Sequence, residues 1–414
     1  MNEMRALVDA FDDAVASEQK CALATLVSVE GSSYRRPGAR MMIREDSRTT
    51  GTISAGCLES DLIDHAMRVI ADGHSQLVEY DTASTSDEMA WGLGLGCNGV
   101  VRVLVEPLPP TSLYIESLRR TCEEAGEGVA ITVATVYECV GTEDAKNRIR
   151  PGARMVIGGD GECKYEGSDA DTVYALENVL GDQLKIGVVP GANAFSANGS
   201  IVRVFIETLL PPVPLVIFGA GQDAMPILEL ARGAGWRTEV VDPQHRTASV
   251  SRFTLADKVT LSRPEDVGAN VKVTPRTVAI LMTHNYAQDL ELLGFLLDSP
   301  AAYIGVMGPK KRTQRMLEEL CSRKGTSLHE HNLERLYSPV GLDIGANSPY
   351  EIALSIVSEM KAVLNDRGGG LLRERHGSIH GRPSDAEPIA ILEDQTEDSI
   401  GVSTECDLNV NHQR

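Results

Sequence analysis

The chain has 414 residues, of which 42% are hydrophobic, and a formal net charge of −20 at pH 7. This length suffices for two or three folded domains, and the negative charge argues against nucleic acid or an anionic membrane surface as the main partner, because phosphates are repelled. No window approaches about 18 consecutive apolar residues, so no membrane span is predicted. Residues 1–20 lack the apolar core of a signal peptide and are typical of an amphipathic helix. The eight cysteines include no CxxC pair, so we expect a cytoplasmic protein with free thiols.

The motif RPGAR occurs twice, at residues 36–40 and 150–154. The β-branched run before the motif and the Asn-Gly turn, alternating strand and proline stop after it are also repeated. The repeated unit therefore covers about residues 21–110 and 129–212. Two copies are too few for a solenoid, so we predict a duplicated α/β domain with pseudo-twofold symmetry.

The two copies differ in their cysteines. Cys57, in SAGCLESD, and Cys97, in GLGLGCNG, have no counterpart in the second copy, where Ala197 replaces Cys97. Cys57 precedes a predicted helix, and a helix N-terminus favours a thiolate. The alternative is that each thiol is a small buried hydrophobic group, and a zinc site is not indicated because His65 and His74 lack ligand spacing.

Three arginines lie around the first Pro-Gly turn: Arg35, Arg36 and Arg40. Guanidinium groups suit the recognition of phosphates or pterin carbonyl groups. The second copy keeps the equivalents of Arg36 and Arg40, which favours a scaffold role for those two, but it has Ile149 in place of Arg35. Ligand binding and a structural role both stay open for these arginines.

After the stiff link PPVP at residues 211–214, strands and helices alternate, which predicts a parallel, doubly wound sheet. GAGQDA at residues 219–224 has the dinucleotide pattern GxGxxA. Gly219 permits a tight turn, Gly221 permits close approach of a pyrophosphate, and Asp242 is placed to bind a ribose hydroxyl. We predict a Rossmann-like fold; the alternative is that its glycine turn serves packing alone, and nucleotide binding would not by itself imply hydride transfer.

Two further polar positions follow predicted strands. His284, with Asn285, ends the strand before one helix, and Asp343 lies in a glycine-rich turn before another. Ligands of open parallel sheets bind at this edge, so each is a candidate for ligand contact, with turn formation as the alternative. Residues 368–414 are polar and aperiodic, and we predict a disordered tail.

Seven stretches in order resemble the XdhC/CoxI family, the accessory proteins of xanthine dehydrogenase and carbon monoxide dehydrogenase. They are EGSSYRRPGARMMI, GTISAGCLESDL, GLGLGCNGVVRVLVEPL, LVIFGAGQDAMPILELARGAGWRTEVVDP, MTHNYAQDLELL, AYIGVMGPKKR and YSPVGLDIGANSPYEIALSIVSEM. Gln222 departs from the family pattern, which commonly has histidine there.

The resemblance implies a chaperone that is an accessory factor and not itself a turnover enzyme. Such proteins bind molybdenum cofactor, a molybdopterin whose dinucleotide form is left open, assist its sulfuration and deliver it to the apoenzyme of a molybdenum hydroxylase. A cysteine desulfurase that supplies the sulfur is an implied partner, and a homodimer is left open. On this reading Cys57 and Cys97 lie close to molybdenum, facing a Rossmann fold that holds the phosphate end of the ligand.

The alternative function is that of an NAD-dependent oxidoreductase using the Rossmann domain, with Asp242 favouring NAD over NADP. The predicted organisation has four parts. They are an XdhC/CoxI-type unit at 1–115, a degenerate second copy at 116–212, a Rossmann-like domain at 213–367 and the tail at 368–414.

Overall fold

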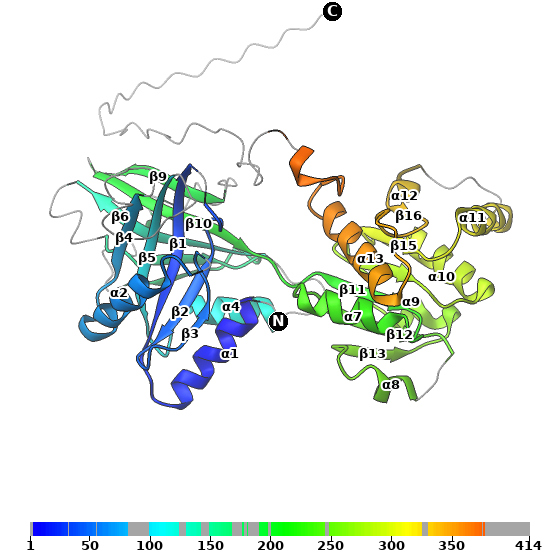
Figure 1. Ribbon diagram of the computed structural model, residues 1–414, viewed down its shortest axis with the longest axis horizontal. Helices are drawn as coiled ribbons and strands as arrows, with labels where there is room; N and C mark the ends of the chain where they lie inside the picture. Colours follow the sequence, from blue (N-terminus) through cyan, green and yellow to red (C-terminus); the bar gives the residue numbers. More distant parts are fainter. Residues whose placement is uncertain are drawn as a thin grey trace, which may run out of the picture.

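In the computed structural model, the described residues form three β-sheets arranged in two lobes (Figure 1). Sheets A and B form the duplicated lobe, residues 3–209, and sheet C forms the Rossmann lobe, residues 214–374. The structure describes residues 3–31, 33–54, 56–81, 99–123, 130–141, 149–167, 176–177, 180, 190–197, 200–244, 248–324, 330–374 and 376. Most of the predicted tail, including 377–414, lies outside these residues, as does Cys97. No helix among them is long and apolar enough to cross a membrane.

The described residues of the first unit of the duplicated lobe form a five-stranded antiparallel sheet and two helices. Its strands lie in the order β3-β2-β1-β5-β4. The elements, in chain order, are α1 (Glu3–Ala16), β1 (Cys21–Gly31), β2 (Arg40–Arg44), β3 (Thr49–Gly51), α2 (Glu59–Asp72), β4 (Gln76–Asp81) and β5 (Gly99–Leu108).

The second unit repeats this arrangement. Its sheet has the order β8-β7-β6-β10-β9, which is the order of sheet A element for element. The elements are α4 (Leu113–Glu123), β6 (Ile131–Val140), β7 (Arg154–Ile157), β8 (Cys163–Glu166), β9 (Gly191–Ala197) and β10 (Ser200–Leu209). The predicted duplication is confirmed, and it extends further than the sequence pattern indicates because α1 and α4 precede equivalent strands.

The RPGAR motif forms the same turn in both units. Gly38 and Gly152 have φ angles of 96° and 93°. In each copy the alanine after the glycine donates its N–H to the carbonyl of the motif's first arginine at 3.1 Å. This is a type II turn, in which proline sets the first central residue and the positive φ of the second requires glycine.

Successive side chains of the strands in the duplicated lobe point alternately into two different cores. Leu23 of β1 and Val133 of β6 share one core with α1 and α4, between the two sheets. The neighbouring residues Ala22 and Ala24 face the other side of sheet A, where they pack against α2. Because successive side chains point to opposite faces of a strand, both faces of sheet A are buried.

Buried ion pairs cross from each sheet of this lobe to the other. The guanidinium of Arg40 on β2 pairs with Glu207 on β10, and that of Arg154 on β7 pairs with Glu106 on β5 at 2.7 Å. The two arginines hold the same place in the repeat, as do the two glutamates. The pairs are therefore equivalent under the pseudo-twofold symmetry that the sequence predicts, and Arg40 is engaged in joining the two units.

The aromatic ring of Tyr114 on α4 lies between the two guanidinium groups. Its centroid is 5.1 Å from the Arg40 guanidinium carbon and 4.9 Å from that of Arg154. The side chains of Arg154 and Glu106 are only 3% and 6% exposed. Charges buried to this degree are stable only while paired, because the lost hydration must be replaced.

Sheet C is parallel and has the strand order β13-β12-β11-β14-β15-β16. With strands numbered from β11, this is the order 3-2-1-4-5-6 of a Rossmann fold, as predicted. The strands are β11 (Pro214–Phe218), β12 (Arg237–Asp242), β13 (Lys258–Leu261), β14 (Val278–Leu281), β15 (Tyr303–Val306) and β16 (Leu336–Tyr337).

Helices cover both faces of sheet C, and two buried cores lie on its two sides. The helices are α7 (Ala224–Gly233), α8 (Ala248–Arg252), α9 (Val267–Asn270), α10 (Tyr286–Asp298), α11 (Lys310–Lys324), α12 (Glu330–Glu334) and α13 (Pro349–Val363), with short 3-10 turns at Pro264–Asp266 and Leu372–Glu374. Ser348 and Glu351 form a capping box at the start of α13, as the sequence SPYE indicates.

Breaking a buried ion pair should destabilise the chain more than breaking an exposed one. We expect Arg154→Met to lower the free energy of unfolding by about 3–5 kcal/mol, because Glu106 is left as an uncompensated buried charge. The control, Arg203→Met, breaks the Arg203–Glu138 pair of the same unit, whose side chains are 39% and 31% exposed, and should cost at most about 1 kcal/mol. Urea denaturation followed by circular dichroism measures both; equal losses would show that burial adds nothing to the pair.

Candidate functional site

The first-copy motifs gather at one end of sheet A, which we call the thiol end. Here β1 ends at Gly31, paired with Gly99 at the start of β5. β3 ends at Gly51 beside the start of β2, so the RPGAR turn and the loop that follows β3 meet at the same end. A Cβ on Gly99 would collide with the carbonyl oxygen of Glu30, so glycine permits the close approach of the two strands.

Cys57 lies at this end, exposed, two residues before α2 begins. Cys97 lies outside the described residues, two positions before Gly99. Gly99, the first described residue after Cys97, is paired at the thiol end, the same end as the Cys57 loop, residues 52–58. The exposed position of Cys57 differs from the buried alternative considered for it; its contact with a ligand stays a prediction.

The Cys57 loop is built around the carboxylate of Glu59. One carboxylate oxygen accepts hydrogen bonds from the Thr52 hydroxyl at 2.6 Å and from backbone N–H groups, and the other accepts from the Ser54 hydroxyl at 2.6 Å and the Gly56 N–H at 2.8 Å. Burial raises the pKa of Glu59, but the hydrogen bonds of Ser54 and Thr52 outweigh it and lower the pKa to about 2. The carboxylate therefore stays ionised and fixes the loop that presents Cys57.

The three arginines of the first turn have different surroundings. Arg35 makes a bidentate pair with Glu3 at the start of α1, with a shortest distance of 2.8 Å. Arg36 is exposed, and Arg40 is paired with Glu207 inside the lobe. Of the three, Arg36 is thus the guanidinium with no ion pair to another described residue. Binding of a ligand by any of them stays a prediction.

In the Rossmann lobe, the strand order reverses between β11 and β14. Ligands of such sheets bind at this switch point, between the loops that follow the two strands, and we call this position the crevice. Gly219 directly follows β11 and has φ 136°, and a Cβ there would collide with the carbonyl oxygen of Met282. Glycine is therefore required for the two loops to approach. This agrees with the tight turn predicted for Gly219.

His284 reaches across this crevice to the glycine turn. Its Nε2 lies 2.6 Å from Oδ2 of Asp223, and its side chain is 62% exposed. His284 also has φ 58°, a left-handed conformation that is uncommon outside glycine. The hydroxyl of the preceding residue, Thr283, donates a hydrogen bond to Asp289. Asp289 is 1% exposed and pairs with Arg312 at 2.8 Å, so a buried carboxylate holds the loop that carries His284.

The two remaining candidates of the Rossmann lobe differ in exposure. Asp242 is fully buried, accepting from the Ser249 hydroxyl at 2.5 Å and the Gln244 N–H at 2.9 Å. Asp343 is exposed, in the loop before α13. The structure thus places Gly219, Gly221 and His284 around one crevice, with Asp242 bonded to Gln244 in the loop after β12 and to Ser249 of α8.

Residues 14–81 match the XdhC and CoxI family, and residues 215–360 match the XdhC Rossmann domain. A Bacillus subtilis protein, named as a probable subunit of xanthine dehydrogenase, is 30% identical over 363 residues, which are 87% of this chain and 97% of that protein. The chain belongs to the XdhC and CoxI family.

Two other similar proteins span most of this XdhC and CoxI family member. The Escherichia coli molybdenum cofactor insertion chaperone PaoD is 22% identical over 355 residues, which are 85% of this chain and 86% of PaoD. A crystal structure of a xanthine dehydrogenase from Bacillus halodurans has a TM-score of 0.67 and 29% identity, covering 89% of this chain and 97% of that one. The resemblance inferred from the sequence motifs is confirmed.

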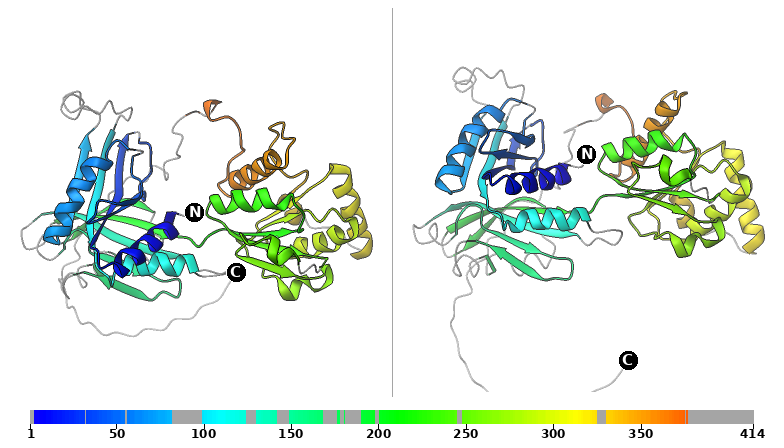
Figure 2. Two further views of the ribbon diagram at one scale, coloured as in Figure 1. Left: turned by 60° about the horizontal axis from the view of Figure 1, so that its bottom comes forward. Right: turned by 90° about the horizontal axis from the view of Figure 1, so that it is seen from below.

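The carboxyl edge of sheet C in this XdhC and CoxI chain faces away from the duplicated lobe. Figure 2 shows β11 running from the linker away from that lobe. A cavity of about 680 Å³ between the lobes is lined by Arg5 and Cys122 on one side and by Trp236 and Arg237 on the other, at the opposite edge of sheet C from Gly219. This cavity is lined by neither Cys57 nor Gly219, so contact of one ligand with both stays a prediction.

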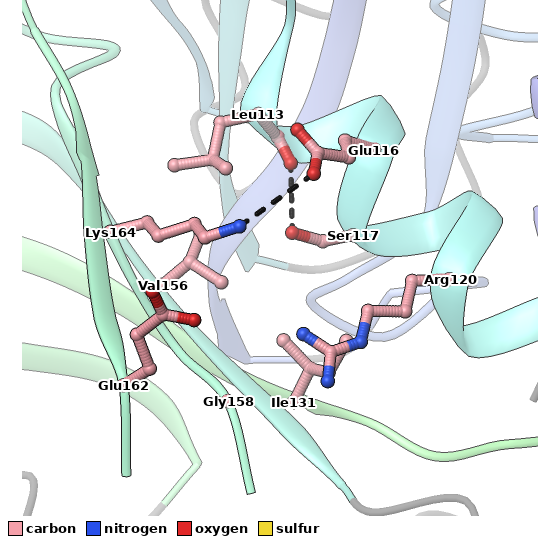
Figure 3. Close-up of a pocket in the computed structure, with 9 residues that line it drawn as sticks. All are labelled: Leu113, Glu116, Ser117, Arg120, Ile131, Val156, Gly158, Glu162 and Lys164. Atoms are coloured by element: carbon pink, nitrogen blue, oxygen red, sulfur yellow. Dashed lines mark hydrogen bonds and ion pairs between the residues drawn. The ribbon is translucent and has the colours of Figure 1, made fainter. Parts of the chain in front are cut away.

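A small groove in the second unit lies between α4 and strands β6 to β8 (Figure 3). Lys164 pairs with Glu116 across it at 3.8 Å. Its cavity volume is about 20 Å³, which is room for about one water molecule. This groove is too small for a pterin or a nucleotide.

Two contributors to these sites were missed by sequence reasoning. Glu59 follows Cys57 by two residues, and an acidic residue in the first turn of a helix is a recognisable signal. Asp223 lies inside the glycine motif at a position the pattern leaves unspecified. Among the described residues, no group of three or more His, Cys, Asp or Glu side chains is placed to hold a metal ion.

Replacing Glu59 should destabilise the chain in a pH-dependent way. The pKa of Glu59 is lowered from 4.5 to about 2, so its stabilisation is present above pH 4.5 and is lost as the pH falls toward 2. We expect Glu59→Gln to lower the free energy of unfolding by about 2 kcal/mol at pH 7, since charge-assisted hydrogen bonds are lost. The difference from the unsubstituted chain should shrink below pH 4.5.

Urea denaturation across pH 2.5–7 measures this difference. Glu45→Gln, at an exposed carboxylate of the same unit, is the control and should change stability little at any pH. A pH-independent difference for Glu59→Gln would show that the charge of Glu59 does not hold the loop.

Proposed function

We propose that the chain is a molybdenum cofactor chaperone that inserts the cofactor into a hydroxylase of the xanthine dehydrogenase type. The observation that carries the proposal is the similarity along both lobes to PaoD, which is named a molybdenum cofactor insertion chaperone. The name of the Bacillus subtilis relative, which refers to xanthine dehydrogenase, supports this class of client.

The thiol end has side chains that fit the metal end of such a ligand. Cys57 is an exposed thiol on a fixed loop, and a thiolate is a soft ligand suited to molybdenum or to carrying sulfur. Arg36 is an exposed guanidinium at the same end, which suits a phosphate or a carbonyl group. We assign the metal-proximal role to Cys57 and propose Cys97, two positions before Gly99 in the sequence, as a second thiol that contacts the ligand.

The finer steps belong to the same proposal. The chaperone assists replacement of an oxo ligand of molybdenum by sulfur before insertion, and a cysteine desulfurase supplies that sulfur. Contact of one cofactor molecule with both Cys57 and the crevice requires a second copy of the chain or rotation of the lobes about residues 210–213. A homodimer is the arrangement that provides both without breaking the contacts of the linker, where Arg276 donates to the Pro211 carbonyl at 2.6 Å.

Copurified cofactor tests the proposal. The full chain, produced in cells that make the cofactor, should carry molybdenum and a fluorescent pterin, and Cys57→Ser should retain at least about tenfold less of both because a metal-proximal ligand is lost. Cys163→Ser, at a partly exposed thiol of the second unit, is the matched control and should retain the full amount.

Equal retention by both cysteine variants would contradict the role of Cys57. Absence of molybdenum and pterin from the unsubstituted chain would contradict the proposed function as a whole.

A further inference from the structure

The position at which a Rossmann fold binds a diphosphate contains a carboxylate in this chain. Diphosphates lie against the glycine turn at the N-terminus of the first helix, where backbone N–H groups and the helix dipole favour negative charge. Here Asp223 immediately precedes α7, and its side chain does not cap the helix. Instead it lies over Gly221, because a Cβ added to that glycine would collide with its Oδ1. The backbone that a pyrophosphate would approach is therefore covered by a negative group.

The position of Asp223 is fixed from across the crevice. His284 Nε2 is 2.6 Å from the other carboxylate oxygen, so the two oxygens of Asp223 have different neighbours: the glycine turn and the imidazole. The loop carrying His284 is itself held by the buried Asp289, which bonds Thr283 at 2.6 Å. The carboxylate of Asp223 thus contacts both loops at the switch point: the glycine turn after β11 and the loop after β14 that carries His284.

A second residue of the dinucleotide pattern is also engaged within the protein. Asp242, which the pattern assigns to a ribose hydroxyl, is fully buried and bonded to Ser249 and Gln244. The nearby Arg252 donates to the carbonyl of Ala220 in the glycine turn at 3.2 Å. The position of Asp223 over Gly221 and the hydrogen bonds of Asp242 therefore both differ from what binding of NAD in the usual Rossmann position requires.

We propose that Asp223 determines the specificity of this crevice: it excludes a diphosphate from the glycine turn and accepts hydrogen bonds from a ligand with adjacent N–H donors. A carboxylate has two oxygens that accept a pair of parallel hydrogen bonds. Among ligands consistent with the proposed function, on which this part rests, the 2-amino-4-oxo edge of a pterin presents such donors. The crevice then takes the pterin end of the ligand, not a dinucleotide's diphosphate.

Binding of simple probes to the full chain separates the two halves of this proposal. Pterin binding is followed by its fluorescence, and inorganic pyrophosphate and NAD binding by calorimetry, for the unsubstituted chain and for Asp223→Asn. The unsubstituted chain should bind pterin and bind pyrophosphate and NAD weakly. Asp223→Asn should bind pterin about tenfold more weakly and pyrophosphate at least about tenfold more tightly, since an amide accepts at one atom only and carries no charge.

Asp266→Asn, at an exposed carboxylate of the same lobe, controls for the loss of one negative charge and should bind both probes like the unsubstituted chain. Thermal melts of the three proteins should coincide, which excludes unfolding as the cause. The proposal is overturned if the unsubstituted chain binds pyrophosphate or NAD as tightly as Asp223→Asn does, or if Asp223→Asn leaves pterin binding unchanged. Copurified molybdenum and pterin test the proposed function separately, so its failure is distinguishable from failure of the role of Asp223.

Discussion

The crossed ion pairs Arg40–Glu207 and Arg154–Glu106 are the constraint on which the duplicated lobe depends. Each pair takes its arginine from one unit and its glutamate from the other, so the buried charges of each unit depend on the other unit; Arg154 is in addition bonded at 3.0 Å to Glu166 of its own unit. Their desolvation is offset only when both sheets are in register with each other. The chain therefore contains, in one polypeptide, the equivalent of a symmetric two-unit assembly with an isologous interface.

Because of this constraint, the residues that hold the two units together occur in both copies of the repeat, whereas the thiol proposed to contact the ligand occurs in one. Both units keep the RPGAR turn and its second arginine because the interface requires them, whereas only the first unit keeps Cys57. The loop carrying Cys57 is fixed by Glu59, and Glu59 itself begins α2, which packs on the outer face of sheet A. Presentation of the thiol thus follows from the fold of the first unit, and the second unit contributes the partner charges that hold that fold together.

Much of this architecture is predictable from sequence, for identifiable reasons. The duplication follows from the repeated RPGAR turn, and the Rossmann fold follows from the alternation of strands and helices after residue 214. The capping box at Ser348 is a local pattern and is equally visible. The ion pairs cannot be predicted from the sequence. Arg40 and Glu207 are 167 residues apart, and the residues next to each in the sequence do not indicate its partner. The membership of α1 and α4 in the repeat is also hidden, since only their positions before equivalent strands are alike.

The candidate site was predictable only in part. The glycine turn and His284 are local signals at strand ends, and they do meet in one crevice. Their relation to Cys57 depends on the direction in which sheet C faces, which is set by the linker and not by any motif. Asp223 lies at an unspecified position of the glycine pattern, so its effect on ligand choice required the geometry of Gly221 and His284.

Protection of Cys57 from alkylation by bound cofactor tests most directly whether the thiol end contacts the metal end of the ligand. Iodoacetamide labelling of the full chain, with and without molybdenum cofactor, is quantified at each cysteine by mass spectrometry. Contact predicts that bound cofactor slows labelling of Cys57 by at least about tenfold while Cys163 in the second unit reacts at the same rate in both states. Equal labelling of Cys57 with and without cofactor would contradict it.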